Sequence, residues 1–274
     1  MKILSFNSFF KGDINRSCAA RSPSEADLSA IRSAGAVILP RGCKESLYHM
    51  ACRNCPRVFP NYDAFYRYPG KTGQIDLFKE NNLLCPNSLI FFDCNEFLKN
   101  HSESPFRFPC VFKFSWGGEG RYVYLLQKHE DFLNCMEMAR YWQKKGLRGF
   151  LFQEYVPAAG RSLRSVVMGR HIFTYWRVQK DPKQFYTNLS RGAFIDKDSD
   201  IHLQDRAVKA TLLFSKKTGL NLAGLDFLFS TEEADPEPLF LEINYFFHYT
   251  GLGGAEGYRR LLRSAITDWL TTTI

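Results

Sequence analysis

The chain has 274 residues, of which 45% are hydrophobic and 23% are charged, and this composition is that of a globular protein rather than a disordered or fibrous one. The net charge of +8 and the pI of about 9.0 favour phosphates, nucleic acid or acidic substrates as binding partners. No stretch stays apolar for about 18 residues, and the apolar start of the chain is too short for a signal peptide, so we expect no membrane span.

The cysteines bear on the compartment of the protein. Eight cysteines without a secretion signal predict reduced thiols and a cytoplasmic location. Cys52 and Cys55 form a single CxxC pair, with Cys43 and His49 nearby. Because no second pair at zinc spacing accompanies them, buried or incidental thiols are a better interpretation than a metal or redox site.

Residues 1–92 alternate between strand-like and helix-like segments. Short apolar runs predict strands at 2–6, 36–40, 58–61 and 84–91. Helical patterns occupy 24–32, 44–52 and 70–80. Ser24 caps the first of these helices and acidic residues follow it in the first turn. The alternation predicts a small α/β domain.

Residues 93–157 are expected to form a second unit. The predicted strands are 110–114, 122–126 and 150–156, and the predicted helices are 93–99 and 128–145. The glycine-rich turn at 115–121 joins the first two strands into a hairpin flap. A polar, proline-containing linker at 101–108 is a further candidate boundary.

Residues 158–274 read mostly as β-structure. Strands are predicted at 163–168, 172–179 and 188–195, and helices at 204–217 and 256–269. Between the two helices, two apolar runs flank a turn-rich segment at 231–238, which predicts a β-hairpin over 222–247.

The predicted hairpin carries polar residues in strands that otherwise look buried: Asp226, Glu242 and Asn244. A carboxylate in an apolar strand costs several kcal/mol unless a partner compensates it. Glu242 and Asn244 share one face of their strand, and antiparallel pairing can bring Asp226 opposite them. Such oxygen ligands suit Mg²⁺, and the alternative is a pair of buried acids satisfied by arginines or backbone amides.

The glycine-rich turn holds four candidate phosphate-binding residues, Ser115, Gly117, Gly118 and Gly120. Glycines let backbone amides approach a phosphate closely, although a tight hairpin alone explains them equally well. The turn is not a Walker A loop, because no Gly-Lys-Ser/Thr follows, and it leads into a strand, which excludes a Rossmann fingerprint.

The order of these features resembles the ATP-grasp superfamily, in its RimK-like and glutathione-synthetase-like carboxylate–amine ligase branch. The resemblance runs from about Lys71 to Gly254 and rests on a lysine strand, a glycine flap, a Gln-Glu-Tyr-Val strand and an Asp…Glu-x-Asn hairpin. It implies an α/β (α+β) fold of three parts: a pre-ATP-grasp domain at 1–92, a lid subdomain with the flap at 93–157, and a C-terminal antiparallel catalytic subdomain at 158–274.

The resemblance also implies roles for individual residues. The ATP phosphates and the adenine would be bound by Lys71, Lys113, Ser115, Gly117, Gly118, Gly120, the exposed edges of Gln153 and Glu154, Tyr155 and Val156. One or two Mg²⁺ ions, with Mn²⁺ as an alternative, would be held by Asp226, Glu242 and Asn244. The acyl phosphate and the acceptor would be held by Arg164, Arg177, Asn188 and Arg191.

The implied activity is ATP- and Mg²⁺-dependent ligation of a small-molecule or peptide carboxylate to an amine or thiol, through an acyl phosphate, with release of ADP and phosphate. An ATP-grasp kinase that phosphorylates a small molecule is the first alternative. A non-catalytic nucleic-acid or ribosome-binding protein is the second; the positive charge and the 15% aromatic content favour it, and the complete set of lysine and metal residues opposes it. Homo-oligomerisation stays open.

Two departures from the family pattern concern the substrate side. After Asn244 the family usually has a small residue and Pro-Gly, whereas this chain has Tyr245-Phe246-Phe247-His248. The residue before the Leu-Arg pair of Arg164, often Asp in RimK-like enzymes, is Ser162. The pocket for the acceptor must therefore differ from that of the family.

Overall fold

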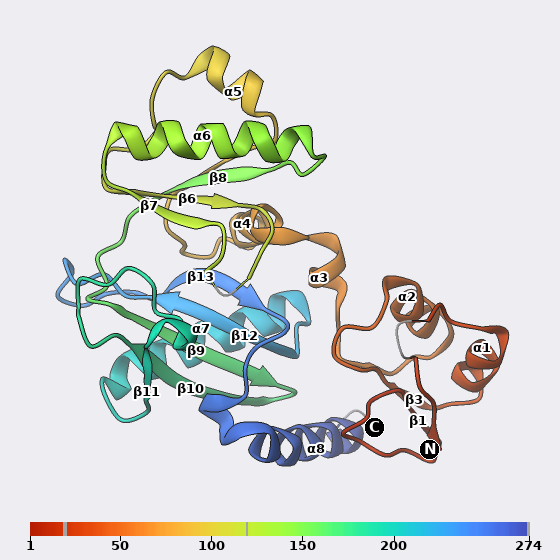
Figure 1. Ribbon diagram of the computed structural model, residues 1–274. Helices are drawn as coiled ribbons and strands as arrows, with labels where there is room; N and C mark the ends of the chain where they lie inside the picture. The colour runs from red at the N-terminus through yellow and green to blue at the C-terminus, as the bar shows by residue number, and fades with distance from the viewer. Residues whose placement is uncertain (19–20, 119, 273–274) are drawn as a thin grey trace.

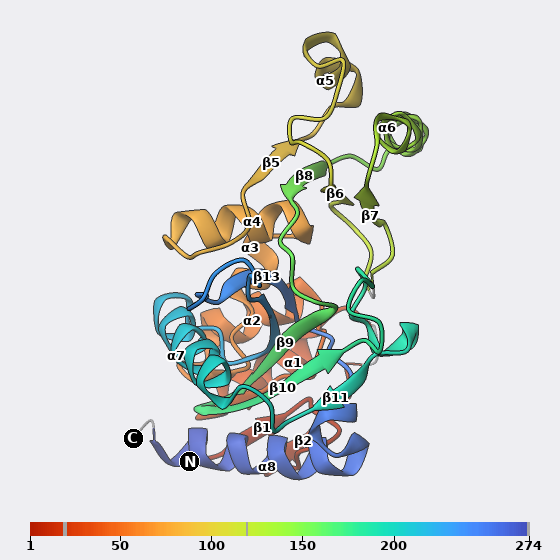
Figure 2. The ribbon, with the colours of Figure 1, turned by 90° about the vertical axis from the view of Figure 1, so that its left-hand side faces the viewer.

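The computed structural model describes residues 1–18, 21–118 and 120–272, arranged around three sheets (Figures 1 and 2). The first sheet is parallel, with the strand order β2-β1-β3-β4. Its elements are β1 (Ile3–Ser5), β2 (Ile14–Asn15), α1 (Glu25–Arg32), β3 (Ala36–Ile38), α2 (Glu45–Asn54) and β4 (Val58–Phe59). The predicted alternation of strands and helices is confirmed. It arises because parallel strands need crossover connections, which helices supply.

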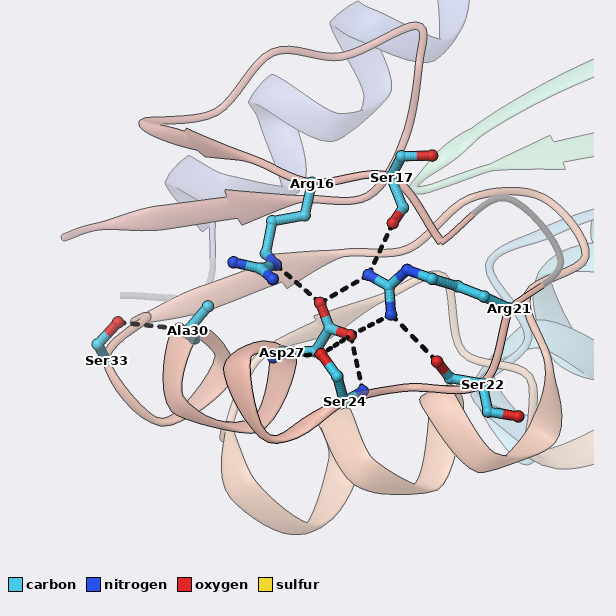
Figure 3. A network of polar contacts seen from close by, with 8 residues as sticks. All are labelled: Arg16, Ser17, Arg21, Ser22, Ser24, Asp27, Ala30 and Ser33. Atoms are coloured by element: carbon cyan, nitrogen blue, oxygen red, sulfur yellow. Dashed lines mark hydrogen bonds and ion pairs between the residues drawn. The ribbon is translucent and has the colours of Figure 1, made fainter.

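A buried carboxylate holds the start of α1 (Figure 3). Asp27 forms a capping box with Ser24, and its Oδ2 accepts a hydrogen bond from Ser24 N at 2.8 Å. Arg16 Nε donates to Asp27 Oδ1 at 2.7 Å, and Arg21 donates to both carboxylate oxygens at 2.5 and 2.9 Å. The bond from Arg21 is the main cause that lowers the pKa of Asp27, so the side chain stays ionised although it has no exposed surface.

Two helices, α3 (Asp63–Arg67) and α4 (Gly70–Glu80), lead from the first sheet to the second. Figure 2 shows α4 lying between the second sheet above it and the third sheet below it. The side chain of Gln74 in α4 accepts a hydrogen bond from Ile243 N at 2.8 Å and donates one to Ile243 O at 2.9 Å. The helix is thereby fixed to the edge of the third sheet.

The second sheet is antiparallel, has the order β5-β8-β6-β7, and carries two helices on one face (Figure 1). Its elements are β5 (Ser88–Phe91), α5 (Cys94–Asn100), β6 (Cys110–Phe114), β7 (Val123–Leu126), α6 (His129–Lys144) and β8 (Phe150–Glu154). The strand predicted at 84–91 begins only at Ser88, because Pro86 offers no N–H to a ladder. The strands of this sheet span the sequence from Ser88 to Glu154, so the expected domain boundary at 92/93 lies within the sheet, just after β5.

The third sheet is antiparallel with the order β11-β10-β9-β12-β13. Its elements are β9 (Arg161–Met168), β10 (His171–Val178), β11 (Phe194–Asp196), α7 (Ile201–Thr218), β12 (Leu222–Leu228), β13 (Leu239–Asn244) and α8 (Gly254–Thr272). The strand predicted at 188–195 is wrong in its first half, since Leu189–Arg191 form a 3-10 helix and the strand starts at Phe194.

Helix α8 joins the first and third sheets. Its buried residues Leu262 and Ile266 belong to one apolar cluster with Ile38 and Phe59 of the first sheet and Val166 of the third. Figure 1 shows the helix below the third sheet. Near its end, the carbonyl oxygens of Trp269 and Leu270 accept hydrogen bonds from Arg57 Nη2 at 3.0 and 2.9 Å, just before β4 of the first sheet. Within the described residues, none of the helices combines the length and the apolarity needed to cross a bilayer.

Candidate active site

The hairpin of β12 and β13 forms as predicted, and its register brings the three candidate metal ligands together. Asp226 pairs with Glu242, and Gly224 pairs with Asn244. The expectation that both strands are buried is wrong for β13, which is the edge strand and alternates between buried and partly exposed residues. The side chain of Glu242 is therefore 27% exposed, whereas that of Asp226 is 4% exposed.

Asp226 is held by two arginines. Arg164, its neighbour across β9 and β12, donates Nε to Oδ1 and Nη2 to Oδ2, the latter at 3.0 Å. Arg177 Nη2 lies 2.9 Å from the same Oδ2, and Asn244 Nδ2 donates to it at 3.0 Å. Burial acts to raise the pKa of Asp226, but the two guanidinium groups outweigh it and lower the pKa. Asp226 is therefore a buried acid paired with arginines, which is the alternative to a metal ligand.

Arg177 has a second anchor. Its Nε and Nη2 donate to Ser162 Oγ at 3.2 and 2.9 Å, and Ser162 Oγ lies 2.7 Å from Thr187 Oγ1. Ser162 has no exposed surface. Ser162, at the position where RimK-like enzymes often have Asp, thus orients Arg177. Its buried hydroxyl is not open to a bound substrate.

Two lysines from different elements approach Glu242. Lys113, in the middle of β6, is 7% exposed. Its ammonium group has no hydrogen-bond or ion-pair partner in the part of the chain that the structure describes. Burial lowers the pKa of Lys113 to about 8. Lys71, at the start of α4, places Nζ 4.0 Å from Glu242 Oε1 and donates to Gly117 O at 2.6 Å. Burial also lowers the pKa of Lys71, although Glu242 opposes this effect.

The flap, residues 115–122 between β6 and β7, is fastened to α4. Lys71 N donates to Ser115 O at 2.7 Å, and Thr72 Oγ1 lies 2.8 Å from Ser115 Oγ. Gly70 has φ of +69°, and a Cβ there would lie 2.5 Å from Ser115 Oγ. Only glycine fits this approach. Glu119, part of the predicted glycine-rich turn, lies outside the described residues.

The loop between β10 and β11 of the third sheet contacts the flap. Tyr186 Oη donates to Val123 O at 2.7 Å, and a Cβ on Gly120 would lie 2.7 Å from Asn188 Oδ1. The guanidinium carbon of Arg191 lies 3.9 Å from the centre of the Tyr186 ring. Asn188 therefore faces the flap, and the guanidinium group of Arg191 lies against the ring of Tyr186.

These elements enclose a cavity between the second and third sheets. The predicted residues that line it are Lys71, Lys113, Gly120, Gln153, Glu154, Tyr155, Val156, Arg177, Asn188, Asp226 and Glu242. The predicted residues outside its lining are Ser115, Gly117, Gly118, Arg164, Arg191 and Asn244. Arg161, Tyr186 and Leu241 line it as well. In the sequence, Tyr186 is one contributor to the 15% aromatic content, and no pattern singles out Arg161.

The predicted adenine strand differs in one detail from expectation. Gln153 is 2% exposed, and its Nε2 donates to Ser88 Oγ at 2.8 Å, so its side chain is buried rather than exposed. Glu154 is exposed, and its N–H donates to Asn87 O at 2.9 Å. The cavity is thus lined by the last two residues of β8 and by Tyr155 and Val156, which follow the strand.

Two oxygen groups of the hairpin, from Glu242 and Asn244, are available to a divalent cation. Glu242 has a single ionic contact, the one to Lys71, and the carbonyl oxygen of Asn244 accepts no hydrogen bond within the described residues. These two hard oxygen groups fit Mg²⁺, whereas Asp226 is already compensated by two arginines. In the same residues no three His, Cys, Asp or Glu side chains cluster around a common point, and Cys43, Cys52 and Cys55 are free thiols.

Comparison with known proteins agrees with this geometry. The model of the RimK-like ATP-grasp domain matches residues 70–255. The chain is 30% identical over 138 residues to "Probable alpha-L-glutamate ligase 1" of Shewanella frigidimarina (strain NCIMB 400), a match that covers 50% of this chain and 42% of that protein. The chain spans less than half the length of the curated relatives it matches.

Solved structures share the fold. The RimK domain protein ATP-grasp from Sphaerobacter thermophilus DSM 20745 superposes with a TM-score of 0.65 at 14% identity, covering 97% of this chain and 99% of that one. The D-alanine–D-alanine ligase of Bacillus anthracis gives 0.60 at 14% identity, covering 94% and 85%. Because the family model matches more than half of the chain and these folds superpose, the chain belongs to the RimK-like ATP-grasp family.

Proposed function

We propose that the protein is an ATP- and Mg²⁺-dependent ligase that joins a carboxylate to an amine and releases ADP and phosphate. The observation that carries this proposal is the convergence of Lys71, Lys113, Arg177 and Glu242 on one cavity beneath the flap. Cations from three elements in a partly buried site suit the phosphates of a nucleotide. Membership of the RimK-like ATP-grasp family supports the same function.

In this proposal the two lysines and the flap amides bind the ATP phosphates. The segment from Glu154, the last residue of β8, to Val156 binds the adenine through backbone groups. Glu242 and Asn244 would hold Mg²⁺, which, when bound, neutralises charge on the phosphates. Glu242 stands at the centre of this arrangement, because it lies opposite Asp226 and within 4.0 Å of Lys71.

The reaction has two steps. A carboxylate oxygen of the first substrate attacks the γ-phosphorus of ATP, the bond to the β–γ bridging oxygen breaks, and ADP leaves. The amine of the second substrate then attacks the acyl carbon, inorganic phosphate leaves with the bonding electron pair, and the amine releases one proton. Arg177, fixed by Asp226 and Ser162, stabilises negative charge on the transferred phosphoryl group without reorganisation.

Amino acids are the proposed substrates. The curated relatives are named alpha-L-glutamate ligases, and structures with the same fold include a D-alanine–D-alanine ligase and an L-amino acid ligase of Bacillus licheniformis. We propose L-glutamate as the first compound to test. The test is ADP release from ATP and Mg²⁺ in the presence of single amino acids, dipeptides and acidic metabolites.

The products of that screen separate the alternatives. ADP formation that depends on an added carboxylate and amine supports the ligase, and AMP with pyrophosphate would refute the proposed mechanism. Hydroxylamine traps an acyl phosphate as a hydroxamate but leaves a phosphate ester unchanged, so a turnover without hydroxamate would indicate a kinase. Tight, steeply salt-dependent RNA binding without any ATP turnover would support the nucleic-acid alternative instead.

Replacement of Glu242 by Gln tests the metal assignment. Gln keeps the shape and one oxygen but removes the charge, so we expect turnover to fall by on the order of 10²–10³ while the fold is kept. Mn²⁺ binding in the presence of ADP, followed by electron paramagnetic resonance, should weaken in parallel. The matched control is Glu237→Gln in the loop of the same hairpin, where the carboxylate is 61% exposed and its ion pair with Arg206 lies outside the cavity. Normal turnover of Glu242→Gln would show that the metal assignment is wrong.

A further inference from the structure

Aromatic residues of the segment that follows Asn244 and of α8 surround Arg41. The guanidinium carbon of Arg41 lies 5.8 Å from the ring centre of Phe246, 5.6 Å from Phe247, 4.9 Å from Tyr249 and 5.9 Å from Tyr258. Arg41 Nη1 also donates to Phe247 O at 2.9 Å. These five residues are called the Arg41 cluster below.

Arg41 stands where an α/β sheet binds ligands. It lies three residues beyond β3, at the carboxyl end of a strand in the parallel first sheet. In open α/β sheets ligands bind outside the carboxyl ends of the strands. The next residue, Gly42, has φ of +77°, and a Cβ there would lie 2.5 Å from Phe246 Cε1. The turn after β3 is thus shaped to bring Arg41 against the chain that follows β13.

The Arg41 cluster adjoins the candidate active site. Gly224 pairs with Asn244 across the hairpin. A methyl group in place of its hydrogen would lie 3.0 Å from Arg164 Nη1 and 3.3 Å from Phe247 Cβ. Phe247 therefore packs against the same backbone as Arg164, and Arg41 binds the carbonyl of Phe247. Phe247 follows Asn244 by three positions, which is at most about 10 Å of extended chain.

Arg41 keeps hydrogen-bonding capacity for a ligand. A guanidinium has five N–H donors, of which one is used on Phe247 O, and the Tyr258 hydroxyl lies beside it. Within the described residues no Asp or Glu forms an ion pair with Arg41, although it is only partly exposed. The rings fix the guanidinium and exclude water on several sides, which strengthens a bond to an anion. A planar cation of this kind recognises a carboxylate by two parallel N–H···O bonds.

We infer that Arg41 binds the carboxylate of the second, amine-bearing substrate, and that this substrate is an amino acid or a peptide whose carboxylate is free. This inference rests on the proposed ligase function. The exposed ring of Phe246, 52% exposed, lines the same position and sets how large a side chain the substrate carries there. The aromatic segment after Asn244 thereby holds Arg41, which comes from the loop after β3, at the proposed acceptor site.

The first test reads binding at Arg41 without turnover. Phenylglyoxal modifies accessible arginines, and peptide mass spectrometry locates the modified positions. With ADP and Mg²⁺ present, L-glutamate should protect Arg41 from modification, whereas glutamic acid diamide, which lacks both carboxylates, should not. Equal labelling with every additive, or an Arg41 that never reacts, would overturn the inference. The two proposals can fail separately. If L-glutamate protects Arg41 but no amino acid stimulates ADP release, the ligase proposal fails while the carboxylate site at Arg41 stands.

The second test uses Arg41→Gln beside Arg67→Gln. Arg67 also lies over a ring, 5.2 Å from the centre of Tyr68, but its side chain is 74% exposed and pairs with Glu80 at 3.9 Å, outside the Arg41 cluster. Loss of a charge-assisted bond predicts a rise in KM for the amine substrate of roughly 10–100-fold for Arg41→Gln and no change for Arg67→Gln. The KM for ATP should stay unchanged in both. Equal KM values for the amine substrate in Arg41→Gln and wild type, or a parallel rise in the KM for ATP, would refute the assignment.

Discussion

Replacement of Asp226 by Asn is expected to destabilise the protein far more than replacement of Glu242 by Gln. The two acids face each other in one hairpin, yet their surroundings differ. Asp226 is 4% exposed and compensates both Arg164 and Arg177, whereas Glu242 is 27% exposed and has one distant contact to Lys71. Asn at position 226 leaves two buried guanidinium groups without a counter-charge.

The magnitude follows from the cost of an uncompensated buried charge. Breaking a buried ion pair by removing one partner costs about 3–5 kcal/mol. A chain of 150–250 residues loses about 2–4 °C of melting temperature per kcal/mol, so the expected loss is roughly 6–20 °C. Glu242→Gln removes a charge that water reaches, and the contact it breaks is long, so the expected change is within about 1 kcal/mol.

Differential scanning calorimetry of the ligand-free wild type, Asp226→Asn and Glu242→Gln at neutral pH checks this prediction. The comparison needs no substrate and no activity. Equal melting temperatures for the two variants would refute the argument, because they would mean that Asp226 is not the counter-charge of the arginines in solution. A stability of Asp226→Asn above that of the wild type would refute it in the same way, since the acid would then be a strained metal ligand.

Three further outcomes are expected. Tyr186→Phe removes the hydroxyl that binds Val123 O, so trypsin should cleave the flap faster in the ligand-free protein, and Tyr124→Phe should not change the rate. Gly70→Ala forces an L residue into φ of +69° against Ser115, which should lower the free energy of unfolding, measured with urea, by about 1–3 kcal/mol. The pKa of Asp27 is lowered in the fold, so the stability from its ion pairs is full above its ordinary pKa of 3.8 and is lost as the pH falls below that value; acid titration of Asp27→Asn should lack this loss.

Local sequence patterns were sufficient for most of the fold. The cap at Ser24, the helix that opens at Gly70 and the hairpin around Asp226 depend on neighbours in the chain, and each forms where it was expected. The segment around Asn188 was misjudged, because its apolar and polar residues suit either a strand or a short 3-10 turn. Asn188 there contacts Gly120, which lies in the flap between β6 and β7 and is far away in the sequence.

The partners of the site residues could not be predicted, because they depend on the order of strands in the sheet. A carboxylate at position 226 indicates that some partner exists, but Arg164 becomes that partner only because β9 lies between β10 and β12. Glu242 looked buried because its neighbours in sequence are apolar. Its exposure follows from the position of β13 at the sheet edge, which no pattern within that strand reveals.

The different surroundings of the two acids suggest a division of tasks in the proposed reaction. Two guanidinium groups that share one carboxylate are held in place, and Ser162 fixes Arg177 a second time. Fixed charges stabilise a developing negative charge more effectively than mobile ones, because they need no reorganisation during the reaction. Asp226 is thus best placed to orient cations towards the transferred phosphoryl group. Glu242, which faces the cavity with few contacts of its own, is free to bind a metal ion together with the phosphates.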